Sequence, residues 1–178
     1  MSNRNVLVYE IVGMFFIIFL GSALHFTYEW SGKLAVVGFV SAVDEAVWEH
    51  LKLAFWPSLL WMIIEFLPLR KITNNFITAK AIGTCLMVVF IPIVFYSYTA
   101  FTGRSIFPID ITTFIIAVVI GQALSYSILK RRQLPSIAGK IALVALVLLG
   151  VIFIVFTFYP PHLPIFQDPN TGGYGIAL

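Results

Sequence analysis

Five long apolar stretches constrain this chain more than any other feature. A helix needs about 20 predominantly apolar residues to cross the hydrocarbon core of a bilayer. Segments of that kind run over approximately residues 6–28, 47–69, 81–101, 109–129 and 141–159. A soluble domain of 178 residues could not bury a chain that is 60% hydrophobic with a mean hydropathy of +0.99. The sequence therefore predicts an all-α, polytopic membrane bundle of about five transmembrane helices, forming a single integral membrane domain over residues 1–178.

One further apolar segment, residues 34–43, is too short to cross a bilayer. It is expected to be a re-entrant or interfacial piece, or the start of the second helix. The first apolar stretch is longer than a signal-peptide core, so we expect it to be retained. The net charge of +3 does not indicate a nucleic-acid partner, because the basic residues lie at the ends of the apolar segments. The expected partners are the lipid bilayer and a lipid or small-molecule substrate, and the oligomeric state stays open.

Basic residues predict the orientation of the chain. Those that precede the first span or lie between spans two and three or four and five are Arg4, Arg70, Lys71, Lys80, Lys130, Arg131, Arg132 and Lys140. The other side has only Lys33, Lys52 and Arg104. Cytoplasmic loops carry an excess of Lys and Arg. We therefore expect a multi-pass cell-membrane protein with a cytoplasmic N-terminus and an extracytoplasmic C-terminal tail over residues 160–178.

Histidines and acids gather on the predicted outer side, in three segments that are distant in sequence: "HFTYEW", "DEAVWEHLK" and "PPHLPIFQDP". Imidazole and carboxylate groups are ordinary ligands of zinc and similar divalent metals. The candidate metal ligands are His25, Glu29, Glu45, His50, His162 and Asp168. Glu49 is the candidate general base, and Asp44 and Lys52 complete the candidate catalytic set. The structural alternative is a solvated helix end, in which Ser41 or Asp44 caps the second helix.

Spacing adds modest support. His25 and Glu29 are four residues apart, as are Glu45 and Glu49, so each pair shares a face if it lies on a helix. The sequence has no H-E-x-x-H, P-loop, G-x-S-x-G or C-x-x-C motif. Two acids, Glu10 and Glu65, lie towards the cytoplasmic half, where Arg4 and Arg70 are their expected partners. The case for a site therefore depends on topology bringing the three polar segments together.

The segments "HFTYEW", "WEHLK" and "PPHLPIFQDPNTGGYGI" resemble the signature of a family of small, uncharacterised prokaryotic multi-pass membrane proteins. The resemblance covers most of the chain. In that pattern the acid pair is more often Asn-Glu followed by Ser, whereas this chain has Asp44, Glu45 and Ala46. The resemblance implies that the motif residues matter, and it implies no activity.

Three functions fit these observations. The first is a membrane-embedded, metal-dependent hydrolase or transferase that acts on a lipid or lipid-linked substrate at the outer face. The second is a small transporter or substrate-binding membrane subunit with an outward-facing polar pocket. The third is haem binding through His25 and His50. The enzyme hypothesis accounts for the most residues, because it uses the histidines and the carboxylates together.

Overall fold

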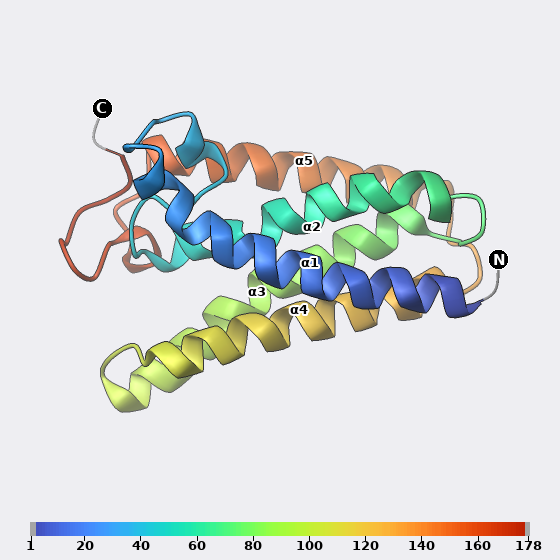
Figure 1. Ribbon diagram of the computed structural model, residues 1–178, viewed down its shortest axis with the longest axis horizontal. Coiled ribbons are helices and arrows are strands. Elements are labelled where there is room, and N and C mark those ends of the chain that lie inside the picture. The colour runs from blue at the N-terminus through green and yellow to red at the C-terminus, as the bar shows by residue number, and fades with distance from the viewer. Residues whose placement is uncertain (1–2, 177–178) are drawn as a thin grey trace.

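The computed structural model describes residues 3–176 and consists of helices and their connections. The five long helices are α1 (Asn3–Trp30), α2 (Val47–Leu69), α3 (Phe76–Thr102), α4 (Phe107–Leu129) and α5 (Ser136–Phe158) (Figure 1). Two short 3₁₀ helices lie at one end: η1 (Val37–Phe39) in the α1–α2 connection and η2 (Pro164–Phe166) in the C-terminal tail. All five long helices are long and apolar enough to cross a membrane. The predicted five-helix membrane bundle is confirmed.

Four of the helices form a closed ring. α1 packs against α2 and α4, and α3 packs against the same two helices. α5 lies outside this ring, against α3 and α2. Many large apolar side chains remain exposed along the helices, among them Phe19, Phe101 and Phe107. Such a surface suits contact with lipid tails, because a soluble protein rarely exposes so much contiguous apolar area.

The connection between α1 and α2 neither crosses the bundle nor extends α2. It folds through η1 and packs against α5 and α1. Ser41 does not cap α2, because its hydroxyl donates to Leu24 O and accepts from the Tyr28 backbone N–H. The N-cap position of α2 is Ala46, which offers no side-chain cap. Glu45 therefore precedes the helix, and the expected helical pairing of Glu45 with Glu49 does not apply.

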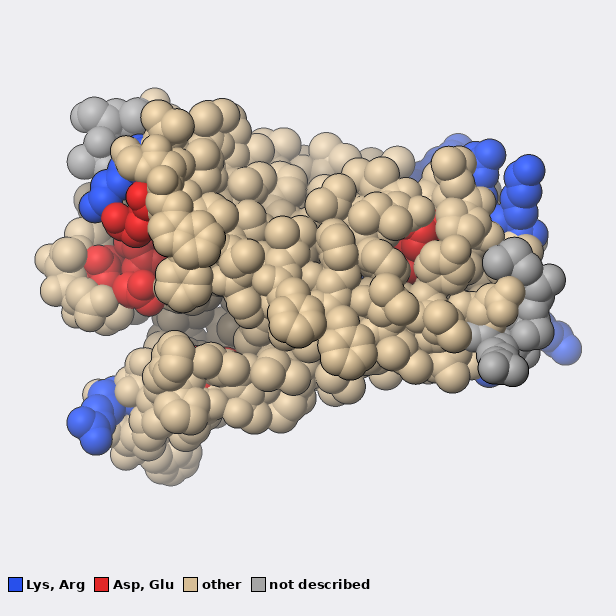
Figure 2. Space-filling view, in the orientation of Figure 1, with Lys and Arg blue, Asp and Glu red and all other residues tan. Residues whose placement is uncertain are grey.

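The two ends of the bundle differ in charge, as Figure 2 shows. We call the end with residues 31–46 and 159–176 the histidine end, and the end with the α2–α3 and α4–α5 connections the basic end. Two lysines that entered the charge count are buried inside the bundle: Lys80 of α3, which we assigned to a loop, and Lys52 of α2, which we counted on the outer side. Without them, seven basic residues stand at the basic end and two at the histidine end; the side chain of Arg4, one of the seven, lies outside the described side chains.

Burial of Lys80 also corrects the expected partners of two acids. Glu10 and Glu65 form ion pairs with Lys80. Arg70 is exposed and stacks over the Phe66 ring instead. The reason is that α3 starts at Phe76, five residues before the predicted span, so Lys80 belongs to the second turn of a membrane helix.

Candidate metal site

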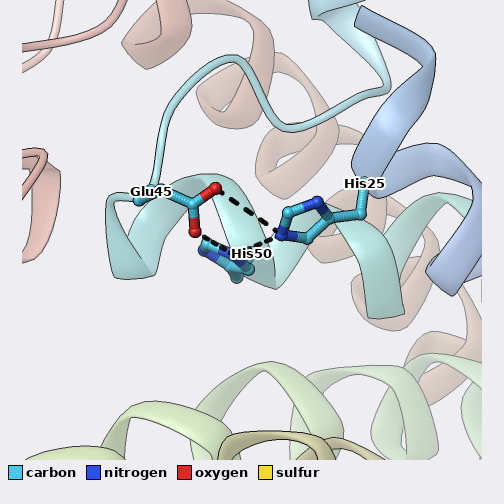
Figure 3. Close-up of side chains that lie close together, drawn as sticks. All are labelled: His25, Glu45 and His50. Carbon is cyan, nitrogen blue, oxygen red and sulfur yellow. Dashed lines mark hydrogen bonds and ion pairs between the residues drawn. The ribbon is translucent and has the colours of Figure 1, made fainter. Parts of the chain in front are cut away.

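Three predicted ligands from two of the three polar segments meet at the histidine end. His25 comes from the last two turns of α1, His50 from the first turn of α2, and Glu45 from the connection just before α2. Their ligand atoms all lie within 4.8 Å of one another. The Nε2 atoms of the two histidines are 3.1 Å apart. Glu45 lies 3.4 Å from His50 Nε2 and 3.8 Å from His25 Nε2, and Figure 3 shows the three side chains pointing toward one another.

These separations suit one tetrahedral metal ion. Zinc binds nitrogen and oxygen at about 2.0–2.2 Å, so two ligand atoms of a tetrahedral site lie about 3.3 Å apart. The two imidazole nitrogens are 3.1 Å apart, close to that value, and each lies within 4 Å of a different carboxylate oxygen of Glu45. Two histidines with one glutamate are a ligand set of catalytic zinc sites, in which the fourth position holds water or substrate.

The tautomer of His50 is set by a second contact. Its Nδ1 lies 2.9 Å from the carbonyl oxygen of Ala46, which can only accept a hydrogen bond. Nδ1 therefore carries a proton, and Nε2 is the atom available for a metal.

The close approach of the two Nε2 atoms does not suit haem, whose axial ligands stand on opposite faces of the ring, roughly 4 Å apart for bonds of about 2 Å.

Local electrostatics favour an ionised Glu45. When His50 is protonated on both nitrogens, the hydrogen bond from its Nε2 lowers the pKa of Glu45 below its usual range, and the charges of His50 and His25 act in the same direction against partial burial. A metal that takes the Nε2 positions displaces protons from the imidazoles, so its binding weakens as the solution becomes more acidic.

Glu49 and Lys52 lie deeper than the three ligands and form a buried ion pair of 2.5 Å. Lys52 also donates to Gly38 O and to Thr157 Oγ1, both at 2.8 Å. Glu49 accepts from the Val43 backbone N–H at 3.1 Å and from the Thr157 hydroxyl at 3.0 Å. The pair therefore fixes the connection before α2 at two points. Sequence reasoning missed Thr157, whose only signal was a lone hydroxyl in the last turns of a very apolar helix.

Asp44 holds the same connection from its other side. One carboxylate oxygen accepts from the Ala46 N–H at 2.9 Å, and the other accepts from the Gly175 N–H at 3.1 Å. Burial raises the pKa of Asp44, and these two backbone hydrogen bonds oppose that effect. The adjacent residue, Glu45, is thereby presented to the two histidines.

The remaining predicted ligands lie apart from this cluster. Glu29 is exposed and pairs with Lys33 at 3.3 Å. His162 is exposed and packs on the ring of Tyr174. Asp168 closes a turn within the tail, where its carboxylate accepts from the Asn170 N–H and the Thr171 hydroxyl.

The described part of the tail folds onto the bundle. Phe166 is buried, with its ring 4.8 Å from that of Trp48. Gln167 and Tyr174 form an isolated bridge, and the Ile176 N–H donates to Thr157 O. Together with the bond from Gly175 to Asp44, these contacts tie the tail to both α5 and the connection that carries Glu45.

Comparison with known proteins gives a family but no activity. The sequence model of the family of unknown function DUF6512 matches residues 1–176, so the chain belongs to that family. No curated protein and no solved structure matches the chain. Function is therefore argued from the site itself.

Proposed function

We propose that this DUF6512 protein is a membrane-embedded, metal-dependent hydrolase or transferase that acts on a lipid or lipid-linked substrate. The observation that carries the proposal is the convergence of His25, Glu45 and His50 on one point, with His50 Nε2 kept available by the Ala46 carbonyl. Two imidazoles and one carboxylate would hold a zinc-like ion and leave a fourth position open. Such an ion lowers the pKa of bound water to about 7, which supplies hydroxide at neutral pH.

In this proposal Asp44, Glu49 and Lys52 position the site. Glu49 and Lys52 are buried and form hydrogen bonds with the connection at Val43 and Gly38. Asp44 accepts hydrogen bonds from Ala46 in the connection and from Gly175 in the tail, so it links the two segments. Such support matters because a metal site loses about 10- to 100-fold in affinity or activity when its outer partners are removed.

Access to the site supports a lipid substrate. At the histidine end the tip of the α3–α4 hairpin stands away from the rest of the bundle, and Figure 2 shows a notch between them with acidic side chains along one edge. One turn along α1 from His25, Gly21 lies tightly against the backbone of Leu53 and the ring of Phe114, which closes the bundle below. An amphipathic substrate in the same leaflet could thus reach the open side laterally with its head group at the metal.

Metal content tests the site directly. The full chain is purified, loaded with zinc or manganese, desalted and analysed for bound metal. We expect one ion per chain in the wild type and its loss in His50→Ala, His25→Ala and Glu45→Gln. The matched controls His162→Ala and Glu29→Gln should keep it, because those side chains lie outside the cluster. A wild type that binds no stoichiometric metal, or controls that lose it equally, would refute the proposed site.

The activity and the orientation need separate measurements. Metal-loaded protein in vesicles should convert a component of a lipid extract, and the His50→Ala variant should not.

Seven basic residues at one end against two at the other favour a cytoplasmic basic end and an extracytoplasmic site. A periplasmic-type reporter fused to the C-terminus should accordingly be active, and a reporter active only in the cytoplasm would reverse this orientation.

A transporter or substrate-binding subunit is the second candidate. The observation that favours it is a buried group of ionisable residues, Glu10, Glu65 and Lys80, within the membrane-spanning part. Ionisable residues at such positions mark ion and proton pathways in carriers. Accumulation of a substrate inside sealed vesicles without chemical change to it would favour this candidate over the enzyme.

A further inference from the structure

The buried group toward the basic end joins three helices through one lysine. Lys80 of α3 forms an ion pair with Glu10 of α1 at 2.6 Å and a second one with Glu65 of α2. The hydroxyl of Ser125 on α4 donates to Glu10 Oε1 at 3.1 Å. We call Glu10, Glu65 and Lys80 the Lys80 triad. None of its side chains is more than 4% exposed, so its charge is not compensated by solvent.

The triad is unbalanced if all its members are ionised. Two carboxylates and one ammonium leave a net charge of −1 inside the bundle. An uncompensated charge is strongly disfavoured in a low-dielectric interior, and the usual response of the group is to neutralise by taking or losing a proton. The other groups that face the triad, Ser125 of α4 and Trp61 of α2, carry no charge that could restore the balance.

Hydrogen bonding indicates which carboxylate is neutral. Glu10 Oε1 accepts from both Lys80 and Ser125. Glu65 contacts Lys80 and faces the indole N–H of Trp61, but neither of its oxygens has a well-aligned hydrogen bond among the described residues. Oε2 of Glu10 has none there either. A carboxylate with more donors is better stabilised in its ionised form. Glu10 is therefore the natural anion and Glu65 the natural acid.

The neighbouring layer contains further unsatisfied groups. Gly13 follows Glu10 by one helical turn, and a Cβ there would collide with the indole nitrogen of Trp61 and the amide nitrogen of Gln122. Both nitrogens are buried and lack a well-aligned acceptor within the described part of the chain, and Gln122 is only 3% exposed. Buried polar groups are rarely left unpaired without a functional reason or a bound species. This layer and the triad together place buried polar groups from α1, α2, α3 and α4 inside the ring of four helices.

The Glu49–Lys52 pair near the histidine end provides an internal comparison. It is equally buried, but it has one positive and one negative charge, and its oxygens and ammonium find partners in Val43, Gly38 and Thr157. That pair is complete as it stands. The Lys80 triad differs from it in both charge and hydrogen bonding.

We propose that the Lys80 triad is a proton-binding site in the membrane interior, in which Glu65 holds one exchangeable proton while Glu10 and Lys80 stay ionised. Protonation of Glu65 removes the excess negative charge of the triad. It also supplies an O–H donor for a carboxylate oxygen that otherwise lacks a hydrogen-bond partner. A metal cation such as Na⁺ fits less well, because the Lys80 ammonium already occupies the position between the two carboxylates. This site is independent of the proposed metal centre.

Infrared spectroscopy of the purified full chain tests the proposal, because a protonated carboxyl and a carboxylate have distinct C–O stretching bands. At neutral pH the wild type should show a protonated-carboxyl band that is absent from Glu65→Gln. Glu10→Gln should lose the same band, since Glu65 then pairs one-to-one with Lys80 and ionises. Lys80→Met should instead raise the band about twofold, because both acids must then be neutral. The exposed-residue control Glu29→Gln should leave the band unchanged.

Circular dichroism establishes which variants are folded. If Lys80→Met does not fold, Glu65→Gln and Glu10→Gln are sufficient to test the proposal. A wild type minus Glu65→Gln difference spectrum that shows loss of a carboxylate band, with no protonated band, would overturn the proposal. So would a protonated band that disappears when NaCl replaces choline chloride at constant pH, because that result identifies a sodium site.

Discussion

Replacing Lys52 with methionine provides a sharp test of the buried pair. The ammonium and the Glu49 carboxylate are 2.5 Å apart, with side chains 0% and 2% exposed. Lys52→Met removes the counter-ion of Glu49, which must then stay buried as a lone charge or take up a proton on folding, and it removes a donor from Gly38 and Thr157. Breaking a buried pair in this way costs about 3–5 kcal/mol. For a chain of this size the apparent Tm should fall by roughly 6–20 °C, since 1 kcal/mol corresponds to about 2–4 °C.

The chain contains a matched control for this variant. Lys33 and Glu29 form an ion pair of 3.3 Å that is about two-thirds exposed. Such surface pairs contribute about 0–1 kcal/mol, so Lys33→Met should lower the Tm by less than about 4 °C. Adding Glu49→Gln to Lys52→Met should recover much of the loss, because the uncompensated charge is then removed. Thermal unfolding of the detergent-solubilised proteins is the assay, and equal shifts for Lys52→Met and Lys33→Met would refute the reasoning.

Three further outcomes follow from contacts described above. In chelator-treated protein, the stabilisation that Glu45 provides should be present above pH 4.5, the ordinary pKa of a Glu, and be lost as pH falls through the lowered pKa of Glu45 in the folded state. The difference in Tm between the wild type and Glu45→Gln, measured across these pH values, reports this stabilisation. A Tm difference that grows on acidification would contradict the prediction. Asp44→Ala should release the tail, because a methyl group cannot accept the hydrogen bond of the Gly175 N–H, and faster hydrogen exchange at residues 172–176 would show this. Gly13→Ala should cost about 1–3 kcal/mol, because its methyl group meets two buried nitrogens, and an unchanged Tm would refute the tight packing there.

The sequence was sufficient to predict the five helices, because apolar length alone determines what can cross a bilayer. The predicted span 47–69 coincides with α2 (Val47–Leu69). Charge made the start of α3 harder to place. Lys80 looks like a loop residue until its buried partners on α1 and α2 are known, and the contact with Glu10 on α1 spans 70 residues of sequence. The signal available in the sequence was the presence of two acids, Glu10 and Glu65, inside apolar stretches.

The candidate site could be predicted only as a region. Topology brought His25 and His50 to one end, but it did not distinguish Glu45 from Glu29 or Glu49 as the third ligand. That choice depends on where α2 begins and how the preceding connection turns. Because α2 starts at Val47, Glu45 is free of helical geometry and reaches both histidines, whereas Glu49 turns into the bundle.

The placement of charge on α2 bears on how the protein is made. Of the five spans, α2 has the lowest mean hydropathy, and it carries Glu49, Lys52 and Glu65. An ionised residue at the centre of an inserting helix costs about 2.5–3.5 kcal/mol. Lys80, the partner of Glu65, is synthesised only with α3. During translation, α2 is therefore expected to remain beside the insertion machinery until α3 emerges, so that the two segments enter the lipid together as a hairpin.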